Sequence, residues 1–423
     1  MRRQWGRGVS LSAAVWGGRD AGPNPSKPRL GFVVSALNTG GAERHAVSLR
    51  AHLLQLGYPS YLLAIAEADR RALFESPGAV GVVDLGTRRL LRNPWAWIRT
   101  AQTMRRLDAD VVFTVNSPVS LMTAMLRRLG LLRGKLVCVF HSTRLQPNER
   151  ASWLGFRLAA RWLDALVFVS ETQRRSWQER GLRCRAVVIN NGVDLDRFSR
   201  SRVDGAFQRR ALGFSPDDYV VGINAALRPE KRHGDLIDAL AQLQARGVAA
   251  KLLVIGEGPE RQAVEGQVQR LGLADAVVLV GDQRDVRPFL AAIDVGVLCS
   301  EFETFSLAAL ETLAMGAPLV SSDVGSMREI VQPGRNGFLF EPGRVDQLVD
   351  RLERLADPLF RSQIAAEARA SISRFSDDAM VQQFDALISS LMATDRTSKS
   401  GRRAVSDLQP VRSQWSSSSL RPD

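Results

Sequence analysis

The feature that most constrains the fold of this chain is an alternation of short, almost wholly apolar runs with longer stretches of helical periodicity, which begins near Arg29 and occurs twice. Runs that are apolar throughout are typical of strands covered by helices on both faces, and their alternation with helices indicates parallel βαβ units. The sequence therefore predicts an α/β protein with two doubly wound domains. Strands are predicted at 29–37, 61–66, 80–85, 110–115, 135–141, 165–170 and 186–190 in the first half, and at 219–227, 250–258, 276–281, 294–300, 318–323 and 337–340 in the second.

The length of the chain agrees with two domains. A chain of 423 residues, 45% of them hydrophobic, can bury two cores of ordinary domain size. The polar segment 197–205 is the expected linker, and the Ser- and Arg-rich C-terminal stretch has too little apolar content to fold. The expected parts are a disordered extension (1–28), a first Rossmann-like domain (29–198), a second (199–375), a helix that packs back toward the first domain (376–393) and a disordered tail (394–423).

Composition excludes several classes of protein. The formal net charge of +13 would suit nucleic acid, an anionic membrane or an anionic small molecule, but lysine occurs at only five of the 57 basic positions, which is typical of a genome-wide bias toward arginine. The three cysteines lie far apart without a C-x-x-C pair, so no disulfide framework or zinc site is expected and a reducing, cytoplasmic setting fits. The N-terminus makes a poor secretory signal, and no apolar run is long enough to span a bilayer.

Polar residues just after strands are the first candidates for a site, because ligands of open α/β sheets bind beyond the carboxyl ends of the strands. The first strand is followed by Gly40 and Gly41 and then by a helix. Glycines there let the backbone approach a phosphate, and the helix N-terminus attracts it. Alternatively, the two glycines only make the turn.

The cationic loop Arg228-Pro229-Glu230-Lys231 follows the first strand of the second half. Arg228 offers a planar fork for phosphate oxygens, and Lys231 offers a compact point charge. Most charge runs are solvated surface. The position of this one, directly past a strand end, favours a ligand site.

The third candidate is a pair of carboxylates, Glu303 at a strand-to-helix turn and Glu311 on the following helix. Eight residues correspond to ~12 Å of helical rise, so both side chains can face one crevice and accept hydrogen bonds from sugar and ribose hydroxyls. The backbone N–H groups of Thr304, Phe305 and Ser306 are expected to start the helix, whose positive end would receive a diphosphate. Alternatively, Glu303 only complements the helix dipole and Glu311 is a surface residue.

In these residues the sequence resembles glycosyltransferase family 4, whose GT-B architecture has two facing Rossmann-like domains. The stretch from Glu303 to Glu311 resembles the family's two glutamates with seven residues between them, and Arg228 and Lys231 resemble its diphosphate-binding Arg and Lys. The resemblance spans roughly residues 29 to 390. Three further segments agree in order: Gly40-Gly41-Ala42-Glu43 with the N-terminal glycine loop, Asn191-Gly192-Val193-Asp194 with the N-G-V-D turn, and Gly256-Glu257-Gly258-Pro259 with the G-x-G-P segment.

The resemblance implies a retaining glycosyltransferase whose donor substrate is a nucleotide-diphosphate sugar and which needs no cofactor. It implies that Glu311 binds the donor ribose and Glu303 the transferred sugar, while Arg228 and Lys231 neutralise the leaving diphosphate. His141, at the end of a predicted strand, resembles the family's active-site histidine near sugar and acceptor; its position alone fits an ordinary strand-end polar residue equally well.

Two positions depart from the family pattern. The family often has glycine where this chain has Thr304 and Ser306. The departure leaves the start of the helix available but affects the fit of the donor sugar.

Charge that develops on a leaving diphosphate must be stabilised by a metal or by fixed cations. Fixed cations are the hypothesis here, so no metal is expected. Two D-x-D sequences, Asp108-Ala-Asp110 and Asp194-Leu-Asp196, match metal-dependent transferases only superficially, because the first precedes a strand and the second belongs to the N-G-V-D turn. No carboxylate nucleophile is evident on the acceptor side, unlike in retaining glycosidases. Front-face transfer, in which a leaving-group oxygen takes the acceptor proton, is therefore the hypothesis.

Two other functions stay open at this point. A GT-B-like enzyme can act on a nucleotide sugar without transfer, as a 2-epimerase or a hydrolase. A noncatalytic nucleic-acid-binding protein is the alternative raised by the charge, but the chain lacks interleaved aromatic and basic residues suited to base stacking, so no nucleic acid is expected as a partner.

The acceptor is the least visible partner. The N-terminal half is expected to bind it, and a lipid-linked or polysaccharide glycan is the class that the resemblance implies. The segments 88–107 and 150–163 mix Arg, Trp and apolar residues, so either could contact anionic headgroups on the inner face of a membrane. Alternatively, each is a helix whose apolar face packs on the sheet.

Overall fold

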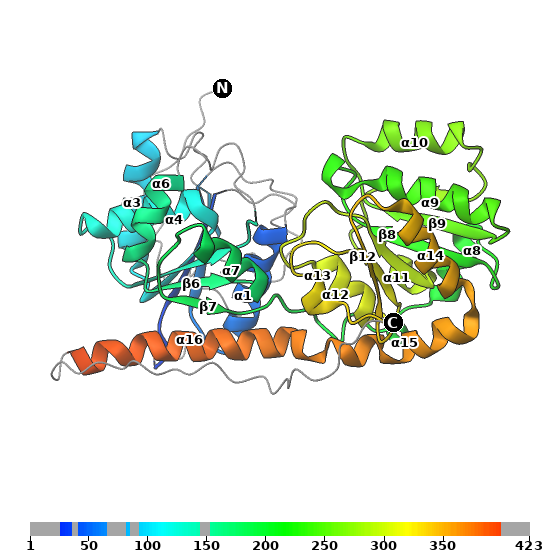
Figure 1. Cartoon of the computed structure of the whole chain (residues 1–423). Helices are drawn as coiled ribbons and strands as arrows, with labels where there is room; N and C mark the ends of the chain where they lie inside the picture. The colour runs from blue at the N-terminus through cyan, green and yellow to red at the C-terminus, as the bar shows by residue number, and fades with distance from the viewer. Residues whose placement is uncertain (1–25, 36–40, 66–81, 85–92, 144–152, 399–423) are drawn as a thin grey trace, which may run out of the picture.

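The computed structural model describes residues 26–35, 41–65, 82–84, 93–143 and 153–398, and within them it contains two separate parallel sheets (Figure 1). The first has the order β3-β2-β1-β4-β5-β6-β7, from β1 (Leu30–Val34), β2 (Ser60–Ala64), β3 (Val82–Asp84), β4 (Val111–Val115), β5 (Lys135–Phe140), β6 (Ala165–Phe168) and β7 (Ala186–Val188). The second has the order β10-β9-β8-β11-β12-β13, from β8 (Tyr219–Asn224), β9 (Ala250–Ile255), β10 (Val277–Leu279), β11 (Val295–Leu298), β12 (Leu319–Ser322) and β13 (Gly337–Phe340). Every predicted strand is present, and the predicted fold class of two Rossmann-like α/β domains is confirmed.

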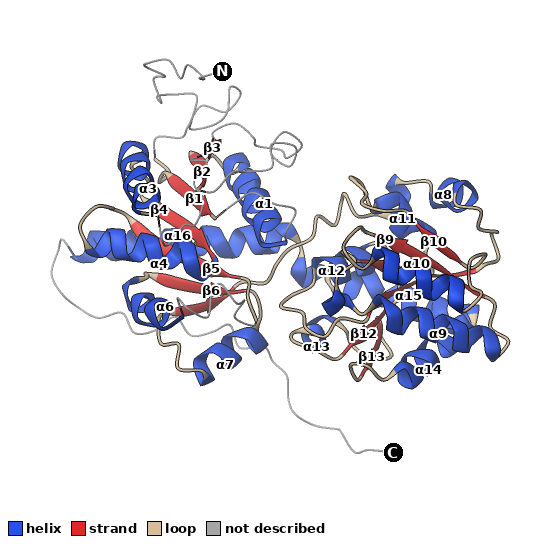
Figure 2. Cartoon of the chain, turned by 90° about the horizontal axis from the view of Figure 1, so that it is seen from above, coloured by secondary structure: helices blue, strands red, loops and turns tan. Residues whose placement is uncertain are grey.

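Helices connect the strands of each sheet, and turning the molecule shows them on both faces (Figure 2). In the first domain they are α1 (Gly41–Gln55), α3 (Pro94–Leu107), α4 (Asn116–Arg128), α6 (Trp153–Ala159), the 3-10 turn η2 (Ala160–Trp162) and α7 (Glu171–Glu179). After these come η3 (Arg200–Arg202), α8 (Gly205–Ala211), η4 (Pro229–Lys231), α9 (His233–Ala245), α10 (Arg261–Arg270), α11 (Arg287–Ala292), α12 (Leu307–Ala314), α13 (Met327–Ile330), α14 (Val345–Ala356), α15 (Pro358–Ser371), η5 (Ser373–Phe375) and α16 (Asp377–Ser398).

Each sheet lies between two hydrophobic clusters, which explains why its strands are apolar throughout. On the first sheet, α3, α4, α6 and α7 cover one face, and α1 and α16 cover the other. On the second sheet, α9, α10 and α14 cover one face, and α11, α12, α13 and α15 cover the other. Every residue of β1 and of β4 is buried, as strands covered on both faces require. None of the described helices has the length and apolarity needed to cross a membrane.

The expected linker is fixed to the second domain. It contains η3, from which the Arg200 guanidinium donates hydrogen bonds to the carbonyl oxygens of Ile293 and Met315, each at 2.7 Å. The two carbonyl groups lie at the C-terminal ends of helices, where backbone carbonyls have no partner within the helix. The Arg200 guanidinium supplies those partners. The changeover between domains is therefore an ordered contact.

The helix α16 crosses back from the second domain to the first and runs along it (Figure 1). Its apolar face, including Phe384 and Ile388, is buried in the cluster that also contains residues of β1 and α1. The helix runs to Ser398, beyond residue 393 where the sequence places its end, because a formed helix extends at low cost. Within the predicted N-terminal extension, Lys27 lies over the Tyr58 ring at 4.0 Å and 3.6 Å from Asp385 of α16.

The strand order locates the ligand crevices. The connections reverse direction between β1 and β4 in the first sheet, and between β8 and β11 in the second. Ligands of doubly wound folds bind beyond the carboxyl ends of the strands at such reversals. The segments after β1, β4, β8 and β11 therefore lie at these crevices, and the segment after β5 lies beside them because β5 is the next neighbour of β4.

Candidate active site

The structure brings two of the four predicted donor-site residues, Lys231 and Glu303, into contact beyond β8 and β11. Lys231 ends η4, the turn that follows β8, and its Nζ lies 2.6 Å from Glu303 Oε1 in the loop after β11. The same oxygen accepts a hydrogen bond from Ser300 Oγ at 2.7 Å. Glu303 is only 8% exposed, so this is a largely buried ion pair with an additional hydroxyl donor. Arg228 begins the same turn but is exposed, and its side chain makes no hydrogen bond or ion pair with a described residue.

Two glycines allow the backbones of this region to approach closely. A Cβ on Gly258, in the G-x-G-P segment, would lie 2.3 Å from the Leu227 carbonyl oxygen, directly before Arg228. A Cβ on Gly325, whose φ is +55°, would lie 1.8 Å from the carbonyl oxygen of Glu303. Only glycine fits such contacts. The two segments therefore support the loops that carry Arg228 and Glu303.

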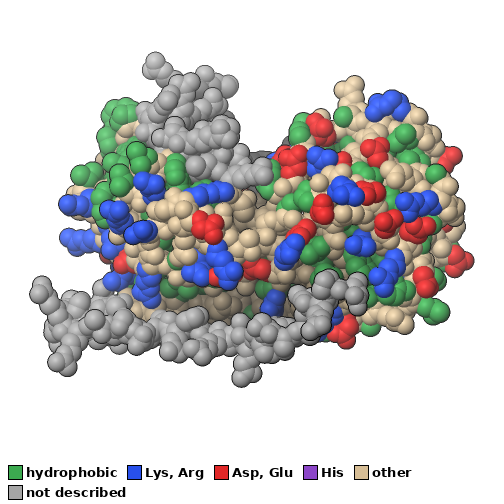
Figure 3. Space-filling model, in the orientation of Figure 1, with side chains coloured by type: hydrophobic (Ala, Val, Ile, Leu, Met, Phe, Trp, Pro, Cys, Tyr) green, Lys and Arg blue, Asp and Glu red, His purple; other side chains and the backbone are tan. Residues whose placement is uncertain are grey.

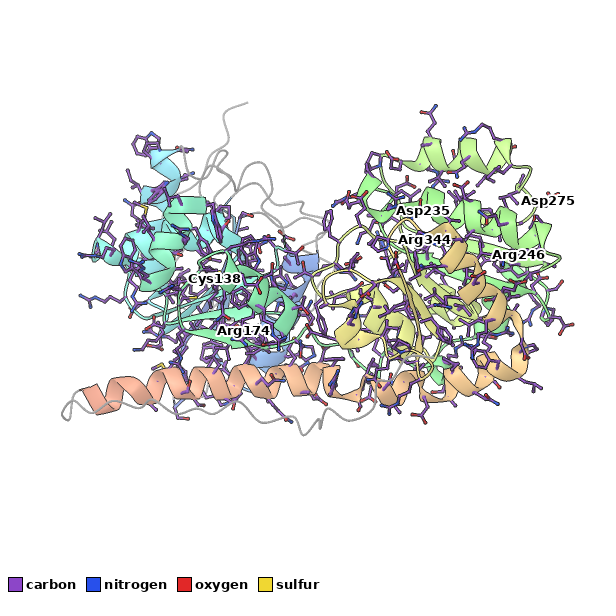
Figure 4. All side chains as sticks on the ribbon, in the orientation of Figure 1. Cys138, Arg174, Asp235, Arg246, Asp275 and Arg344 are labelled. Carbon is purple, nitrogen blue, oxygen red and sulfur yellow. The ribbon has the colours of Figure 1, made fainter. Side chains whose placement is uncertain are left out.

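A second ion-pair group flanks the first. The Arg232 guanidinium donates to Asp235 at 2.7 Å and to Glu301 at 3.3 Å. Figure 4 labels Asp235, on α9, and so shows where this ion-pair group lies in the second domain. Because these carboxylates hold Arg232, neighbouring Lys231 is left to pair with Glu303.

Glu311 lies on α12 and is 8% exposed. One carboxylate oxygen accepts a hydrogen bond from Asn224 Nδ2, at the end of β8, at 3.1 Å. The other lies 3.9 Å from Arg44 of α1, in the other domain. Burial raises the pKa of Glu311 to about 7, and Arg44 offsets only part of that effect. The alternative prediction that Glu311 is a surface residue is therefore wrong. The residue is a buried carboxyl group at the interface of the two domains.

The helix after Glu303 starts later than predicted. It begins at Leu307, and Ser306 is its N-cap, with the hydroxyl accepting from Ala309 N. The backbone N–H groups of Thr304 and Phe305 therefore precede the helix instead of starting it. The hydroxyl at position 304, where the family often has glycine, donates to the His141 carbonyl oxygen at 2.7 Å and so joins the two domains.

His141 follows β5, and its side chain is packed inside the first domain. Its backbone N–H donates to Asn116 Oδ1 at 2.9 Å, and its ring meets the ring of His45 edge to face, with centroids 4.8 Å apart. Burial and the neighbouring His45 hold the pKa of His141 well below its usual value, and burial lowers that of His45 to about 4. Both imidazoles are thus neutral at pH 7. Their buried ring nitrogens, Nε2 of His141 and both of His45, have no hydrogen-bond partner in the described residues.

The other predicted positions lie as follows. Gly40 falls outside the described residues, whereas Gly41 is the first residue of α1. Asp108 and Asp110 lie before β4, where both contact Arg29, and Asp194 accepts the backbone N–H of Arg197. Among the described residues no three His, Cys, Asp or Glu side chains are grouped so as to hold a metal ion.

Comparison with known proteins identifies the family. The model for Glycosyltransferase Family 4 matches residues 39–197, and the model for Glycosyl transferases group 1 matches residues 204–371. A GDP-mannose-dependent alpha-mannosyltransferase of Mycobacterium tuberculosis is 30% identical over 289 residues, which cover 65% of this chain and 71% of that one. This chain belongs to glycosyltransferase family 4.

Two further comparisons agree with this family. The N-acetyl-alpha-D-glucosaminyl L-malate synthase of Bacillus anthracis is 30% identical over 193 residues, which span 45% of this glycosyltransferase and half of that enzyme. The crystal structure of Anabaena Alr3699/HepE in complex with UDP superposes with a TM-score of 0.76 at 24% identity, covering 86% of this chain and all of that one. The predicted family and GT-B fold are confirmed, and the chain is a nucleotide-sugar-dependent glycosyltransferase.

Sequence reasoning missed several residues of this glycosyltransferase's site. Asn224 is the last residue of a strand that was predicted to extend further, and a polar residue inside an apolar run was the available signal. His45 and Arg44 follow the glycine loop on α1, where nothing in the sequence distinguishes them from surface residues. Ser300 lies three residues before Glu303 and showed no signal of its own.

Proposed function

We propose that this chain is a retaining, metal-independent glycosyltransferase that transfers a sugar from a nucleoside-diphosphate sugar to a hydroxyl of a glycan or lipid-linked acceptor. The observation that carries the proposal is the pairing of Lys231 with Glu303, next to the buried Glu311, at the reversal between β8 and β11. The acceptor oxygen bonds to the anomeric carbon as the bond to the diphosphate breaks. The acceptor proton passes to a diphosphate oxygen, and the nucleoside diphosphate leaves.

Glu311 is proposed to bind the donor ribose. A carboxylate offers about four lone-pair positions, and Asn224 uses one. Ribose hydroxyls can donate to the others. Such bonds favour the charged form and lower the raised pKa of this carboxyl, so donor binding is coupled to loss of the Glu311 proton.

Lys231 and Arg228 are proposed to neutralise the diphosphate. The Lys231 ammonium has three donors, and Glu303 accepts one of them, which leaves two for phosphate oxygens. Arg228 is exposed at the start of the same turn, and no described carboxylate lies within ion-pair distance of it. Fixed cations directed at developing charge supply the stabilisation for which other transferases use a metal.

Glu303 is proposed to hold the transferred sugar through its second carboxylate oxygen. The first oxygen already accepts from both Lys231 and Ser300. A carboxylate held by an ammonium and a hydroxyl is a weak nucleophile, which favours front-face transfer over a covalent glycosyl-enzyme. His141 is proposed to bind sugar or acceptor hydroxyls as a neutral imidazole, in keeping with its lowered pKa.

A binding and product analysis tests the proposal. UDP-glucose, UDP-N-acetylglucosamine and GDP-mannose are screened by thermal shift in EDTA, because relatives include a GDP-mannose-dependent enzyme and a structure with UDP. A donor at 100 times its Kd should stabilise the fold by about 2.7 kcal/mol. The transfer product should keep the donor's anomeric configuration by NMR. Inversion, a covalent adduct on Glu303 or a requirement for metal contradicts the proposal, and epimerised donor without acceptor favours the 2-epimerase.

We also propose that the first domain contacts an anionic membrane. The helix α3 packs residues such as Met104 on the sheet, as expected if segment 88–107 is a helix whose apolar face covers the sheet. The same helix leaves Trp95 71% exposed. Hydrophobic side chains gather where α3, α4 and α6 lie side by side, at the upper left of Figure 3. The exposed apolar side chains of this face are Trp95, Ile98, Met125, Leu129, Leu154, Leu158 and Trp162.

This apolar face is strongly basic. Residues 93–143 and 153–163 together include eight arginines and one lysine. They contain only two acidic side chains, Asp108 and Asp110, and the next acidic residue is Asp164. Interfacial surfaces combine buried apolar side chains with cations that face anionic headgroups. Sedimentation with vesicles of phosphatidylglycerol should fall when Trp95 and Leu154 are both replaced by Ser. Leu359→Ser, which removes an exposed leucine of α15, is the matched control. Equal binding by both variants contradicts the proposal.

A further inference from the structure

A cavity of about 280 Å3 lies between the two domains. On one side it is bounded by α7 and the residues after β5, and on the other by the loops after β11 and β12. Its volume is just below the range of about 300–1,000 Å3 that holds drug-sized ligands. A cavity of this volume accommodates a single sugar ring.

The cavity adjoins the donor site through Glu303 and Thr304. Glu303, proposed above to hold the transferred sugar, is part of its wall, whereas Arg228, Lys231 and Glu311 are not. The side chains proposed for diphosphate and ribose thus lie outside it. A molecule in this cavity can reach the transferred sugar without competing for the nucleotide's groups, which is the position of an acceptor.

The helix α7, which forms the first-domain wall, has one row of side chains committed to the fold. Gln173 Nε2 donates to the carbonyl oxygens of Phe140 and Ser142 at 2.8 and 3.0 Å, and Trp177 Nε1 donates to the latter at 2.8 Å. Both side chains are buried. This row fixes the helix to β5 and leaves no donor of its own for a ligand.

A second row, formed by residues of α7 and its C-cap Arg180, is less committed to the fold. Thr172, Ser176 and Arg180 follow one another at four-residue spacing and all border the cavity. Side chains so spaced lie along one helix face over about 12 Å. Neither hydroxyl has a hydrogen-bond partner among the residues that the structure describes. This row therefore presents two hydroxyls and a guanidinium to a ligand.

The position of α7 is fixed from the second domain as well. Glu329 of α13 accepts the backbone N–H groups of Glu171 and Thr172 at 3.2 and 2.8 Å. A carboxylate at a helix N-terminus is stabilised by the helix dipole. Because this contact crosses between the domains, it holds the two walls of the cavity at a defined separation.

Among the described residues that line the cavity, Arg180 is a cation without an anionic partner. Glu303 and Glu301 are paired with Lys231 and Arg232. Arg180 lies 4.7 Å over the Trp177 ring and donates one hydrogen bond to the Thr143 carbonyl oxygen at 3.2 Å, but no carboxylate of the described residues is within 4 Å of it. A guanidinium held in place in this way matches the geometry of a carboxylate or phosphate.

We propose that this cavity is the acceptor subsite and that it takes a sugar carrying an anionic group, a carboxylate or a phosphate, whose charge meets Arg180 while Thr172 and Ser176 meet its hydroxyls. The assignment rests on the proposed glycosyltransferase function and specifies the class of its acceptor. An acceptor hydroxyl near Glu303 then attacks the anomeric carbon of the donor, and its proton leaves with the diphosphate.

The test compares acceptors that differ only in charge, after the donor screen has named the donor. The acceptors are p-nitrophenyl glucoside, p-nitrophenyl glucuronide and glucose 6-phosphate with glucose as its neutral counterpart. Wild type should use at least one anionic acceptor with at least tenfold higher kcat/KM than its neutral counterpart, and which one it prefers tells carboxylate from phosphate. Arg180→Gln should reduce that ratio at least tenfold, and Arg180→Lys should restore part of it.

Two measurements keep the outcomes apart. Arg175→Gln removes a neighbouring arginine of α7 that is paired with Glu171, and it should leave the ratio unchanged. Arg180→Gln should bind the donor as tightly as wild type by thermal shift. Weaker donor binding by this variant, or equal use of charged and neutral acceptors by wild type, overturns the acceptor assignment. Failure of every nucleotide sugar to bind wild type contradicts the proposed function itself.

Discussion

The two walls of the interdomain site are built differently. On the second domain the charged groups hold one another: Lys231 and Ser300 fix Glu303, and Asn224 fixes Glu311. On the first domain several polar groups next to the site lack partners within the described chain, namely three ring nitrogens of His45 and His141 and the hydroxyls of Thr172 and Ser176.

The difference indicates how the two substrates are handled. A wall whose groups are already paired is preorganised for a ligand of fixed chemistry, which the diphosphate and ribose of a donor are. The unpaired ring nitrogens of His45 and His141 are buried, and a buried polar group without a partner costs stability until a ligand supplies one. We therefore expect loss of a group that holds Glu303, such as Lys231 or Ser300, to reduce both stability and turnover, and substitutions in the first-domain wall to separate the two.

The largest effect is expected for Lys231→Ala. This change removes a cation proposed to stabilise the leaving diphosphate and leaves Glu303 buried without its ion-pair partner. Loss of one such electrostatic group typically lowers kcat by about 100- to 1,000-fold. Steady-state kinetics with the identified donor measure it. Lys251→Ala, which removes a half-buried lysine bonded to the Asp275 carbonyl oxygen, serves as control. Turnover within a factor of three of wild type contradicts a preorganised second-domain wall.

Glu311→Gln tests the same wall through pH. The pKa of Glu311 is raised from 4.5 to about 7 by burial, so between these values the folded protein keeps a proton that the unfolded chain has released. The contribution of Glu311 to the free energy of unfolding is therefore full below pH 4.5 and is lost as pH rises through about 7. One pKa unit is about 1.4 kcal/mol, so the cost at pH 8 is of the order of 3 kcal/mol.

The neutral amide removes that cost. Melting temperatures between pH 4.5 and 8 should show Glu311→Gln gaining on wild type as pH rises, while donor affinity at pH 8 falls because an amide accepts fewer bonds from ribose than a carboxylate does. An identical pH dependence of melting in the two proteins would show that burial does not raise the pKa of Glu311 in the folded protein.

The fold could be predicted from sequence because its signal is local. Strands buried on both faces must be apolar throughout, and each of the predicted runs contains an observed strand. Arg228, Lys231, Glu303 and Glu311 could be found because they follow β8 and β11, and position past a strand end does not depend on side-chain conformation.

The partners of these residues could not be predicted in the same way. Which oxygen of Glu303 faces Lys231 and Ser300 depends on side-chain conformations. The contacts of Arg44 and Thr304 join residues of different domains that lie more than 100 positions apart in the sequence, so they depend on how the domains meet. The start of α12 was misplaced because Ser306 was taken as a helix residue when its side chain makes it the N-cap.

A smaller effect is expected for Glu329→Gln. The Glu329 carboxylate joins the two walls of the cavity. A neutral amide can still accept a backbone N–H of α7 but loses the interaction with the helix dipole, about 0.3–1 kcal/mol. We expect the acceptor KM to rise two- to fivefold with little change in donor affinity, since only the cavity wall moves. Glu341→Gln, on the exposed segment after β13, is the matched control. A change in donor affinity larger than that in acceptor KM would place Glu329 with the donor wall instead.

The effect most specific to the comparison is a difference in sign between His45→Phe and Ser300→Ala. Phenylalanine keeps a ring against His141 and removes two buried nitrogens that lack partners, so it should stabilise the fold by about 1 kcal/mol. Removing the Ser300 hydroxyl takes a donor from a buried carboxylate and should destabilise by about 1–2 kcal/mol. Melting temperatures at pH 7 measure both. If His45→Phe melts lower than wild type, the ring nitrogens have partners in solution, and the first-domain wall is as preorganised as the second.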